Sequence, residues 1–189
     1  MNILNASSAK PLRGGPSFST VNRAERMIWN ITWVLLARWT PPNFSRWRLM
    51  LLRMFGANIK SGAAISNSAK IWLPRNLTMQ KFATIGPRVN CYNMDLVEVG
   101  EFTTISQGAV LCGGTHDISD PDFQLVARSI KIGDHVWIAA EAFVGPGVSV
   151  GNGAVLGARS CAFRDLEPWT VYGGNPAKPL KLRKWRVKD

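Results

Sequence analysis

Hydrophobic residues recur every six positions through most of the chain. The series with this spacing are Ile132, Ile138, Val144, Val150 and Leu156, then Val99, Ile105 and Leu111, and more weakly Met79, Ile85 and Cys91 or Ile59, Ile65 and Ile71. Glycine often follows directly, at Gly86, Gly100, Gly133, Gly145, Gly151 and Gly157. A small or β-branched residue stands four positions after the aliphatic one, at Ala63, Ala69, Val89, Thr103, Ala109, Val136, Ala142, Val148, Ala154 and Ser160. Each six-residue unit predicts a short strand and a corner, so we expect a mainly β protein, a parallel β-helix with these residues inside and glycine at its corners.

The ends of such a coil need covers, because one coil cannot bury its own inner face. Residues 22–39 have the pattern of a helix that closes before Pro41, and a second helix is expected from residue 43 or 45 to Phe55, ended by Gly56. The second helix is expected to group Trp47, Leu51 and Met54 and to leave Arg46, Arg48 and Arg53 on its remaining surface.

Three segments are therefore expected. Residues 1–56 comprise a disordered arm, up to about residue 21, and two capping helices; residues 57–166 form the β-helix; residues 167–189 form a C-terminal turn and basic tail. The apolar centre of the first helix, residues 27–37, is shorter than the roughly 20 residues that a bilayer crossing needs. Two roles stay open for residues 22–56: capping the coil, or lying in the plane of an anionic membrane surface.

Two interruptions break the period. Cys91 and Val99 are eight residues apart, which predicts a local bulge. Leu111 and Ile132 are 21 residues apart, and the polar sequence between them contains Gly113, Gly114 and Pro121. We expect an excursion loop at residues 113–129, where a rigid scaffold commonly carries function.

Charge narrows the choice of partners. Twenty-three Lys and Arg oppose 12 Asp and Glu, giving a net charge of +11 and a pI near 10.2. Nucleic acid, an anionic membrane and a phosphorylated cofactor would all be attracted. Nucleic acid is the least favoured, because the basic residues cluster at the ends of the chain and form no recognisable binding module.

Cysteine usage and the amino terminus favour a cytoplasmic protein. Cys91, Cys112 and Cys161 lack the paired spacing of a zinc site or disulfide framework, so buried reduced thiols are expected. Residues 1–21 are polar and lack the features of a secretory signal. The predicted location is the cytoplasm, with the inner face of the membrane as an extension of that prediction.

The excursion loop contains His116, one of two histidines. Imidazole is well suited to removing a hydroxyl proton near neutral pH, and a loop thrown out of the coil can bring it to a neighbouring surface. His116 is therefore the candidate catalytic base.

Three stretches resemble the hexapeptide-repeat acyltransferases, a family that includes galactoside, maltose, serine and Nod-factor acetyltransferases. They are GGTHDISDP, IKIGDHVWIAAEAFVGPGVSVGNGAVLGARS and PWTVYGGNPAKPLK, within a likeness that covers residues 48–184. The nearest group is that of colanic-acid-type exopolysaccharide O-acetyltransferases.

The resemblance implies a left-handed β-helix, a homotrimer and active sites between subunits. It implies that His116 deprotonates a sugar hydroxyl, which attacks the thioester of acetyl-CoA directly, with no metal. Backbone N–H groups of the WIAAE turn would stabilise the oxyanion; because Ala140 stands where relatives often have Ser, only main chain can contribute there. A sugar or lipid-linked glycan is the implied acceptor, with serine or an antibiotic as alternatives.

Further site residues follow from the same resemblance. On the cofactor side, Trp137 would wall the pantetheine channel, or else be a surface residue, and Ala158 would leave room for the pantetheine arm. Lys178, Lys181 and Arg164 would meet the CoA phosphates, unless the basic residues are only a solvated tail. On the acceptor side the candidates are Asn90, Asn93, Asp95 and Asp117, and either aspartate could instead orient His116.

Two competing functions use the same coil. A γ-type carbonic anhydrase needs three histidines around zinc, and only His116 and His135 exist. A noncatalytic scaffold or membrane-associated partner of a glycan-assembly complex would suit the Trp-rich helices and the charge, but it leaves His116 in its loop unexplained.

Overall fold

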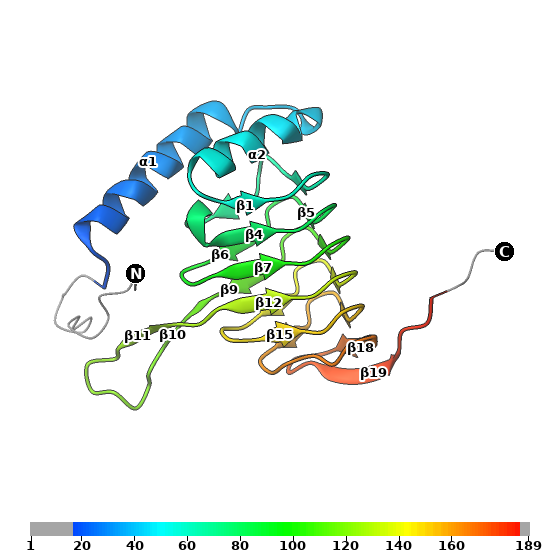
Figure 1. The fold of residues 1–189 in the computed structure, drawn as a ribbon. Coiled ribbons are helices and arrows are strands. Elements are labelled where there is room, and N and C mark those ends of the chain that lie inside the picture. The colour runs from blue at the N-terminus through cyan, green and yellow to red at the C-terminus, as the bar shows by residue number, and fades with distance from the viewer. Residues whose placement is uncertain (1–16, 186–189) are drawn as a thin grey trace.

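The chain forms a three-sided parallel β-helix capped by two helices (Figure 1). The computed structural model describes residues 17–185. Buried hydrophobic residues face inward along the whole length of the coil and form a single core. The fold class predicted from the six-residue period is confirmed.

The strands of successive coils align into three sheets, which we call faces 1, 2 and 3. Face 1 consists of β1 (Asn58–Ile59), β4 (Leu77–Met79), β7 (Val97–Val99), β12 (Ile130–Ile132) and β15 (Ser149–Val150). Face 2 consists of β2 (Ala64–Ile65), β5 (Thr84–Ile85), β8 (Thr104–Ile105), β13 (Trp137–Ile138), β16 (Val155–Leu156), β18 (Thr170–Gly173) and the antiparallel β19 (Lys178–Leu182). Face 3 consists of β3 (Lys70–Ile71), β6 (Asn90–Tyr92), β9 (Val110–Cys112), β14 (Phe143–Val144) and β17 (Cys161–Ala162).

The predicted inward positions stack on one another from coil to coil. Ile105 pairs in parallel register with Ile85 on one side and Ile138 on the other. Ile105 and Leu111 are fully buried, as are the small residues Ala109 and Ala142. Large and small side chains therefore alternate around each coil and fill its interior.

Glycine at the corners is required by space. A Cβ on Gly100 would lie 2.4 Å from the carbonyl carbon of Gly133 in the next coil, and one on Gly151 would lie 2.5 Å from Pro168 N. The left-handed backbone angles fall at other corner positions, among them Phe82, at φ 57°. The sequence reading thus placed these glycines correctly, and close backbone approach explains them.

The three faces give the coil a triangular cross-section, so the coil resembles a prism with three edges. All the interruptions of the six-residue period lie along the edge between faces 3 and 1, which we call edge 3–1. The short 3-10 helix η4 (Pro74–Asn76) fills it after β3, and the predicted bulge fills it after β6. After β9 the chain leaves the coil as a hairpin of β10 (Gly114–His116) and β11 (Leu125–Ala127), which projects from the side of the coil in Figure 1. The expected loop at 113–129 is therefore an ordered hairpin.

Two helices cover the first coil. They are α1 (Thr20–Leu36), capped by the Ser19 hydroxyl, and α2 (Ser45–Met54), which follows the 3-10 helix η3 (Pro42–Phe44). Trp29 and Leu52 of these helices are buried, and the Trp29 indole N–H donates to the Ile71 carbonyl at 2.7 Å. These contacts bury the inward side of both helices against the first coil. The first helix begins and ends two to three residues before the predicted positions 22 and 39.

The buried face of α2 differs from the prediction. Arg48 is only 1% exposed. Its guanidinium donates to the carbonyls of Ile65, Pro41 and Pro42 and to the Thr40 hydroxyl, at 2.8–2.9 Å. The prediction for Arg48 was wrong because the chain around α2 supplies carbonyl oxygens that satisfy the buried charge.

The other side of α2 also differs from the prediction. Trp47 and Met54, expected to share an apolar face with Leu51, are 38% and 71% exposed, whereas Leu51 is buried. The helix therefore turns a largely apolar surface outward.

The C-terminal part is more regular than expected. Parallel stacking continues past residue 166, because β18 pairs with β16. The expected turn and tail contain β19, which folds back along β18. The arm expected at residues 1–21 lies outside the described residues up to residue 16, and Phe18 packs on Trp72 with ring centroids 5.1 Å apart.

The three cysteines are free thiols. Cys91 is buried as expected, and burial raises its pKa to about 12. Cys112 and Cys161 are half-buried.

Replacement of Arg48 by methionine should destabilise the cap. One buried and three partly buried acceptors would lose their donor, so we expect the free energy of unfolding to fall by about 2–4 kcal/mol. Arg46→Met, at an exposed position of the same helix, is the matched control and should change it by less than about 0.5 kcal/mol. Equal denaturation midpoints for the two variants would contradict this assignment.

Candidate active site

His116 is held at the end of β10 by its own hairpin. Its Nδ1 lies 2.9 Å from the Phe123 carbonyl oxygen, and its ring stacks on the Phe123 ring with centroids 4.3 Å apart. Phe123 adopts a left-handed backbone conformation, at φ 51°. The tip of the hairpin therefore fixes both the position and the plane of the imidazole.

This contact decides which nitrogen of His116 can accept a proton. A carbonyl oxygen only accepts, so Nδ1 carries the hydrogen, and in the neutral ring Nε2 is left with a free lone pair. The ring is half-buried. The arrangement is that of a general base with an orienting partner.

Neither aspartate orients this ring. Asp95 accepts from the backbone N–H of Leu96, and Asp117 accepts from that of Ser119. Both are exposed. The option that one of them positions His116 was wrong, because the main chain of Phe123 occupies that role; no feature of the sequence distinguishes such a carbonyl.

A second group of predicted residues lies along edge 2–3, where faces 2 and 3 meet. Leu156 stacks on Ile138, so the turn that contains Ala158 lies directly below the turn that contains Ala140. The backbone N–H of Arg159 joins the two turns by donating to the Ala140 carbonyl at 2.9 Å. Ala158 is exposed, and the two small side chains leave this edge open.

Trp137 stands beside this edge on face 2. It is 48% exposed, and its indole N–H donates to the Ser106 hydroxyl at 2.9 Å, which holds the ring against the neighbouring coil. Ser106 was not singled out from the sequence, because only the stacking of coils brings it next to Trp137.

The Ala140 turn has a free backbone donor. The N–H groups of Ala139, Glu141 and Ala142 donate to the carbonyls of Leu156, Gln107 and Ala139. Among the described residues no acceptor is paired with the Ala140 N–H. A donor of this kind on a rigid turn is what a developing oxyanion requires.

The basic candidates divide between two places. Lys178 and Lys181 are exposed on β19. Lys178 lies opposite Gly173, at the end of β18 next to edge 2–3, whereas Lys181 lies opposite Val171, farther along face 2. Arg164 is exposed beyond β17, on edge 3–1. Within one protomer the structure brings Lys178 to the edge that carries Ala158, places Lys181 farther along face 2, and leaves Arg164 on edge 3–1.

Asn90 lines a cavity between α1 and face 3. The cavity has a volume of about 300 Å³ and includes Asn30, Arg38, Lys70 and Trp72 in its wall. These four were not among the predicted site residues, since nothing in the sequence shows that α1 lies across β3 and β6.

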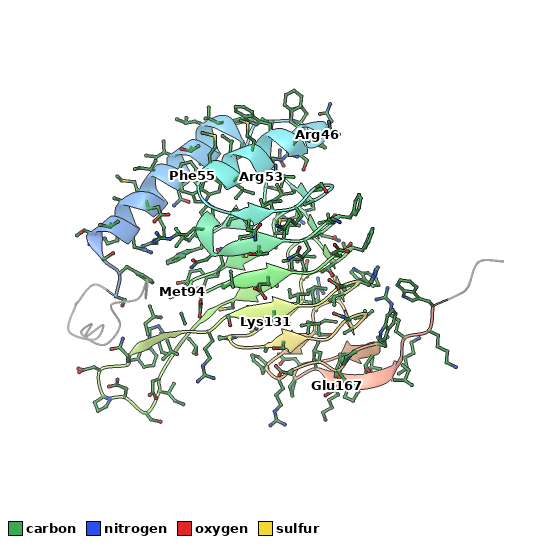
Figure 2. The ribbon with its side chains drawn as sticks, viewed as in Figure 1. Arg46, Arg53, Phe55, Met94, Lys131 and Glu167 are labelled. Carbon is green, nitrogen blue, oxygen red and sulfur yellow. The ribbon has the colours of Figure 1, made fainter. Side chains whose placement is uncertain are left out.

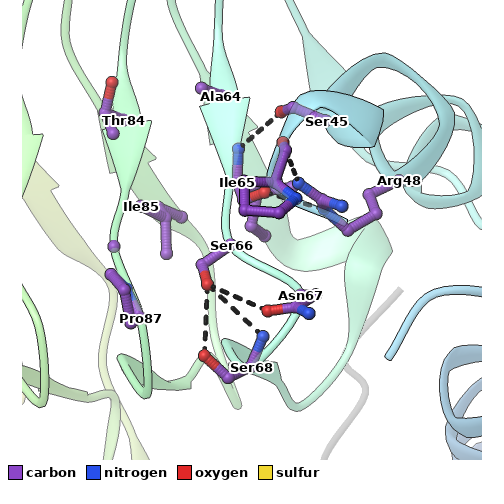
Figure 3. A pocket seen from close by; sticks show the side chains of 12 residues that line it. Ser45, Arg48, Ala64, Ile65, Ser66, Asn67, Ser68, Thr84, Ile85 and Pro87 are labelled. Atoms are coloured by element: carbon purple, nitrogen blue, oxygen red, sulfur yellow. Dashed lines mark hydrogen bonds between the residues drawn. The ribbon is translucent and has the colours of Figure 1, made fainter. Parts of the chain in front are cut away.

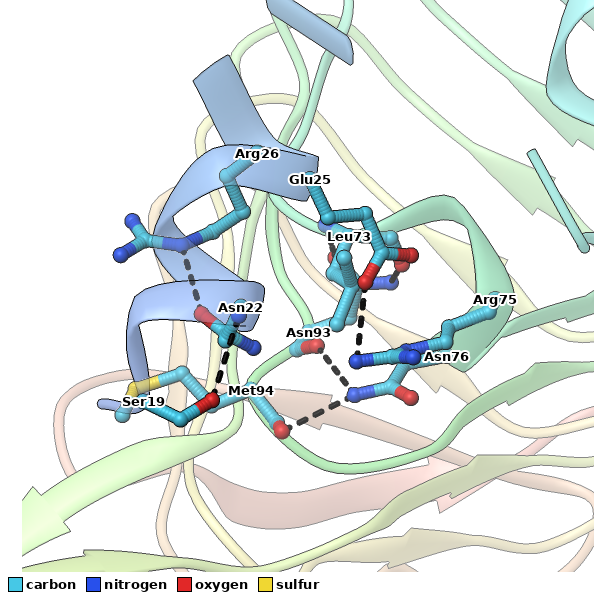
Figure 4. A network of polar contacts seen from close by, with 9 residues as sticks. All are labelled: Ser19, Asn22, Glu25, Arg26, Leu73, Arg75, Asn76, Asn93 and Met94. Carbon is cyan, nitrogen blue, oxygen red and sulfur yellow. Dashed lines mark hydrogen bonds and ion pairs between the residues drawn. The ribbon is translucent and has the colours of Figure 1, made fainter. Parts of the chain in front are cut away.

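Asn93 is fully buried and cannot contact an acceptor in this structure. Its side-chain oxygen accepts from the backbone N–H groups of Trp72 and Leu73, and its amide donates to the Leu73 carbonyl at 2.7 Å. Figure 4 shows it beside Asn76, whose amide donates to the carbonyls of Asn93 and Met94. The prediction for Asn93 is corrected to a structural role in the bulge.

A further cavity of about 370 Å³ lies between α2 and the start of face 2 (Figure 3). Ser45, Ser66, Asn67 and Ser68 are in its wall. The three serines and the asparagine bond to each other or to nearby backbone, as for Ser45, which accepts from Ile65 N–H. In residues 17–185 no cluster of three His, Cys, Asp or Glu side chains could hold a metal ion.

Similarity to known proteins agrees with this architecture. The chain is 38% identical over 174 residues to "Putative colanic acid biosynthesis acetyltransferase WcaF" of Escherichia coli (strain K12), covering 92% of each protein. The chain belongs to the hexapeptide-repeat acetyltransferase family. A model described as bacterial transferase hexapeptide (six repeats) matches residues 129–161 of this acetyltransferase.

Solved structures share the fold. A maltose O-acetyltransferase from Clostridium difficile 630 superposes with a TM-score of 0.77 and 21% identity, over 88% of this chain and 90% of that one. The acetyltransferase VCA0836 from Vibrio cholerae O1 biovar eltor, complexed with acetyl coenzyme A, gives a TM-score of 0.78 and 19% identity, over 88% and 91%.

Asn90 and Asn93 of this acetyltransferase provide a matched pair for testing the site. Asn93→Ala should lower the free energy of unfolding by about 2–3 kcal/mol, because buried main-chain groups lose their partners. Asn90→Ala, at an exposed strand position, should change it by less than about 0.5 kcal/mol. Chemical denaturation of both variants checks this, and an Asn93→Ala variant as stable as Asn90→Ala would show that the bulge does not depend on the amide.

Proposed function

We propose that this acetyltransferase moves an acetyl group from acetyl-CoA to a sugar hydroxyl of a glycan in exopolysaccharide biosynthesis, with His116 as general base. The observation that carries the proposal is the hydrogen bond between His116 Nδ1 and the Phe123 carbonyl. It leaves Nε2 as an acceptor on a projecting hairpin. Transfer to a sugar is supported by the names of WcaF and of the maltose O-acetyltransferase with the same fold.

The chemistry needs one proton transfer and one stabilised charge. His116 Nε2 takes the proton of the acceptor hydroxyl as the oxygen attacks the thioester carbonyl. The Ala140 N–H faces the charge that develops on the carbonyl oxygen. Collapse of the tetrahedral intermediate expels the CoA thiolate, which takes the proton back from the His116 imidazolium. The acetyl group passes directly from CoA to the acceptor oxygen, and no covalent enzyme intermediate forms.

Edge 2–3 fits an extended pantetheine arm ending in phosphates. Ala140, Ala158 and Gly174 occupy equivalent positions in three successive coils, and exposed Ala158 and Gly174 leave a strip without bulky side chains. Trp137 walls one end of the strip. Lys178 supplies positive charge at the other end, and Lys181 adds to it from farther along face 2.

A complete site requires more than one protomer. His116 leaves the coil from edge 3–1, whereas the donor strip follows edge 2–3, and face 3 separates the two. The hairpin projects away from its own coil (Figure 1). In an assembly with a neighbouring copy, such a hairpin can reach the neighbour's strip. This supports a homotrimer with sites between subunits, in which Arg164 on edge 3–1 could approach the neighbour's CoA phosphates.

The Asn90 cavity is the proposed acceptor side. Asn30, Lys70 and Arg38 offer hydrogen bonds to sugar hydroxyls. Trp72, whose ring is covered by Arg26 at 4.4 Å, contributes an apolar wall. Asp95 and Asp117 are exposed near edge 3–1 and remain candidates for contacts with a larger glycan.

A screen of glycans and small acceptors with acetyl-CoA tests the function. Release of the free CoA thiol should depend on a sugar acceptor, and His116→Ala should lower kcat by about 10²–10⁴-fold while the variant stays folded and trimeric. His135→Ala, which removes the other histidine, is the control and should retain kcat. Turnover unchanged in His116→Ala would remove this imidazole from the mechanism.

The same screen separates the enzyme from the scaffold alternative. A noncatalytic partner of a glycan-assembly complex would release no thiol with any acceptor. Serine or an antibiotic as the preferred acceptor would keep the acetyltransferase but reject the sugar.

Filling the donor strip should impair the donor side alone. Ala158→Phe should raise the KM for acetyl-CoA by about tenfold or more, since a ring would occupy the space for the pantetheine arm. The KM for the acceptor should stay the same. Ser149→Phe, at an exposed position on face 1, is the control. Equal KM values for acetyl-CoA in the two variants would contradict the assignment of this strip as the pantetheine site.

A further inference from the structure

The outer surface of the two capping helices exposes large apolar side chains that neither the core nor the proposed site uses. On α1, Met27, Ile31 and Leu35 follow helical spacing and are 59%, 52% and 66% exposed. On α2, Met50 and Met54 are 41% and 71% exposed. We call this surface the cap face.

The α1–α2 connection extends the same surface. Trp39, just after α1, is 81% exposed, and Phe44, just before α2, is 50% exposed. Tryptophan and phenylalanine at the edge of an apolar helix face are typical of segments that lie in a lipid headgroup region.

The charges of the cap are almost all positive. Residues 17–56 contain six arginines and one acidic residue, Glu25, which pairs with Arg75 at 2.9 Å. Arg38 lies just after α1, in the connection between the two helices. Arg46 and Arg53 lie on α2 (Figure 2), and Arg23, Arg38, Arg46 and Arg53 are all exposed. The Arg53 guanidinium donates to the Ile59 carbonyl at 2.9–3.1 Å, so Arg23, Arg38 and Arg46 are the arginines offered to an external anion.

We propose that the cap face binds the surface of an anionic lipid bilayer, with the two helices lying in the headgroup plane. The apolar side chains enter the interface, and the arginines meet lipid phosphates. Among residues 17–185 no helix is long and apolar enough to cross a membrane. The absence of unpaired acidic groups in described residues of the cap favours an anionic lipid surface over a basic or neutral partner.

This surface adjoins the cavity assigned to the acceptor. Val34 of α1 and Arg38, just after α1, line the cavity, and Val34 is 43% exposed. A glycan linked to a lipid could thus enter the cavity while its carrier stays in the bilayer. This link rests on the proposed function; lipid binding itself does not.

Co-sedimentation of the full-length protein with vesicles tests the proposal. We expect binding to phosphatidylcholine vesicles that contain phosphatidylglycerol, little binding to phosphatidylcholine alone, and weaker binding at high salt. The double variant Ile31→Glu/Leu35→Glu should bind anionic vesicles about tenfold less. Its turnover with a soluble acceptor should match that of the wild type, so that lipid binding and catalysis are judged separately.

The control carries the same charge change at the opposite end of the coil. Leu180→Glu/Leu182→Glu alters two side chains of β19 that are 67% and 69% exposed, and it should bind vesicles like the wild type. Equal loss in both double variants would mean that net charge alone governs binding and would overturn the proposal. So would a change of oligomeric state confined to Ile31→Glu/Leu35→Glu, which would make the cap face a contact between copies of the chain.

Discussion

Each coil of this protein is stabilised by the coils above and below it, and the remaining structure depends on that stacking. Main-chain hydrogen bonds and inward ladders such as Ile85, Ile105 and Ile138 require neighbouring coils to keep strand spacing, about 4.8 Å. Gly100 and Gly151 have no space for a Cβ for this reason. The first coil has no coil above it, so α1 and α2 must bury its interior, and Arg48 satisfies carbonyl oxygens at that junction.

The same constraint decides where the chain can carry function. Residues inserted on a face would break the ladders, whereas residues inserted at a corner need not. Edge 3–1 receives η4, the Asn93 bulge and the hairpin in successive coils. The Asn93 amide replaces lost main-chain partners there, and the longest insertion can then project with its own antiparallel pairing. His116 is thus placed by a rigid element outside the coil.

The proposed active site combines features that different edges of the prism provide. Edge 2–3 offers small residues and a free N–H at Ala140, because every coil repeats the same turn there. Edge 3–1 offers the imidazole. Face 3 separates the two edges within one protomer, so the incomplete site of the single chain itself argues for assembly. The cap face also follows from the way the helices cover the coil. The inward side of each helix packs against the core, whereas the outward side is exposed, apolar and positively charged.

The six-residue period determined the coil, its buried positions and the place of the excursion, because each depends only on which residue types recur at fixed spacing. The histidine in that excursion could also be recognised from the sequence. Only the tertiary structure decided that Phe123 orients His116, that Asn93 is structural and Asn90 faces a cavity, and that Arg48 is buried while Trp47 is exposed. These outcomes depend on side chains that meet main-chain carbonyl groups 7 to 20 residues away in the sequence. A local pattern of side chains does not encode which main-chain atoms each side chain will meet.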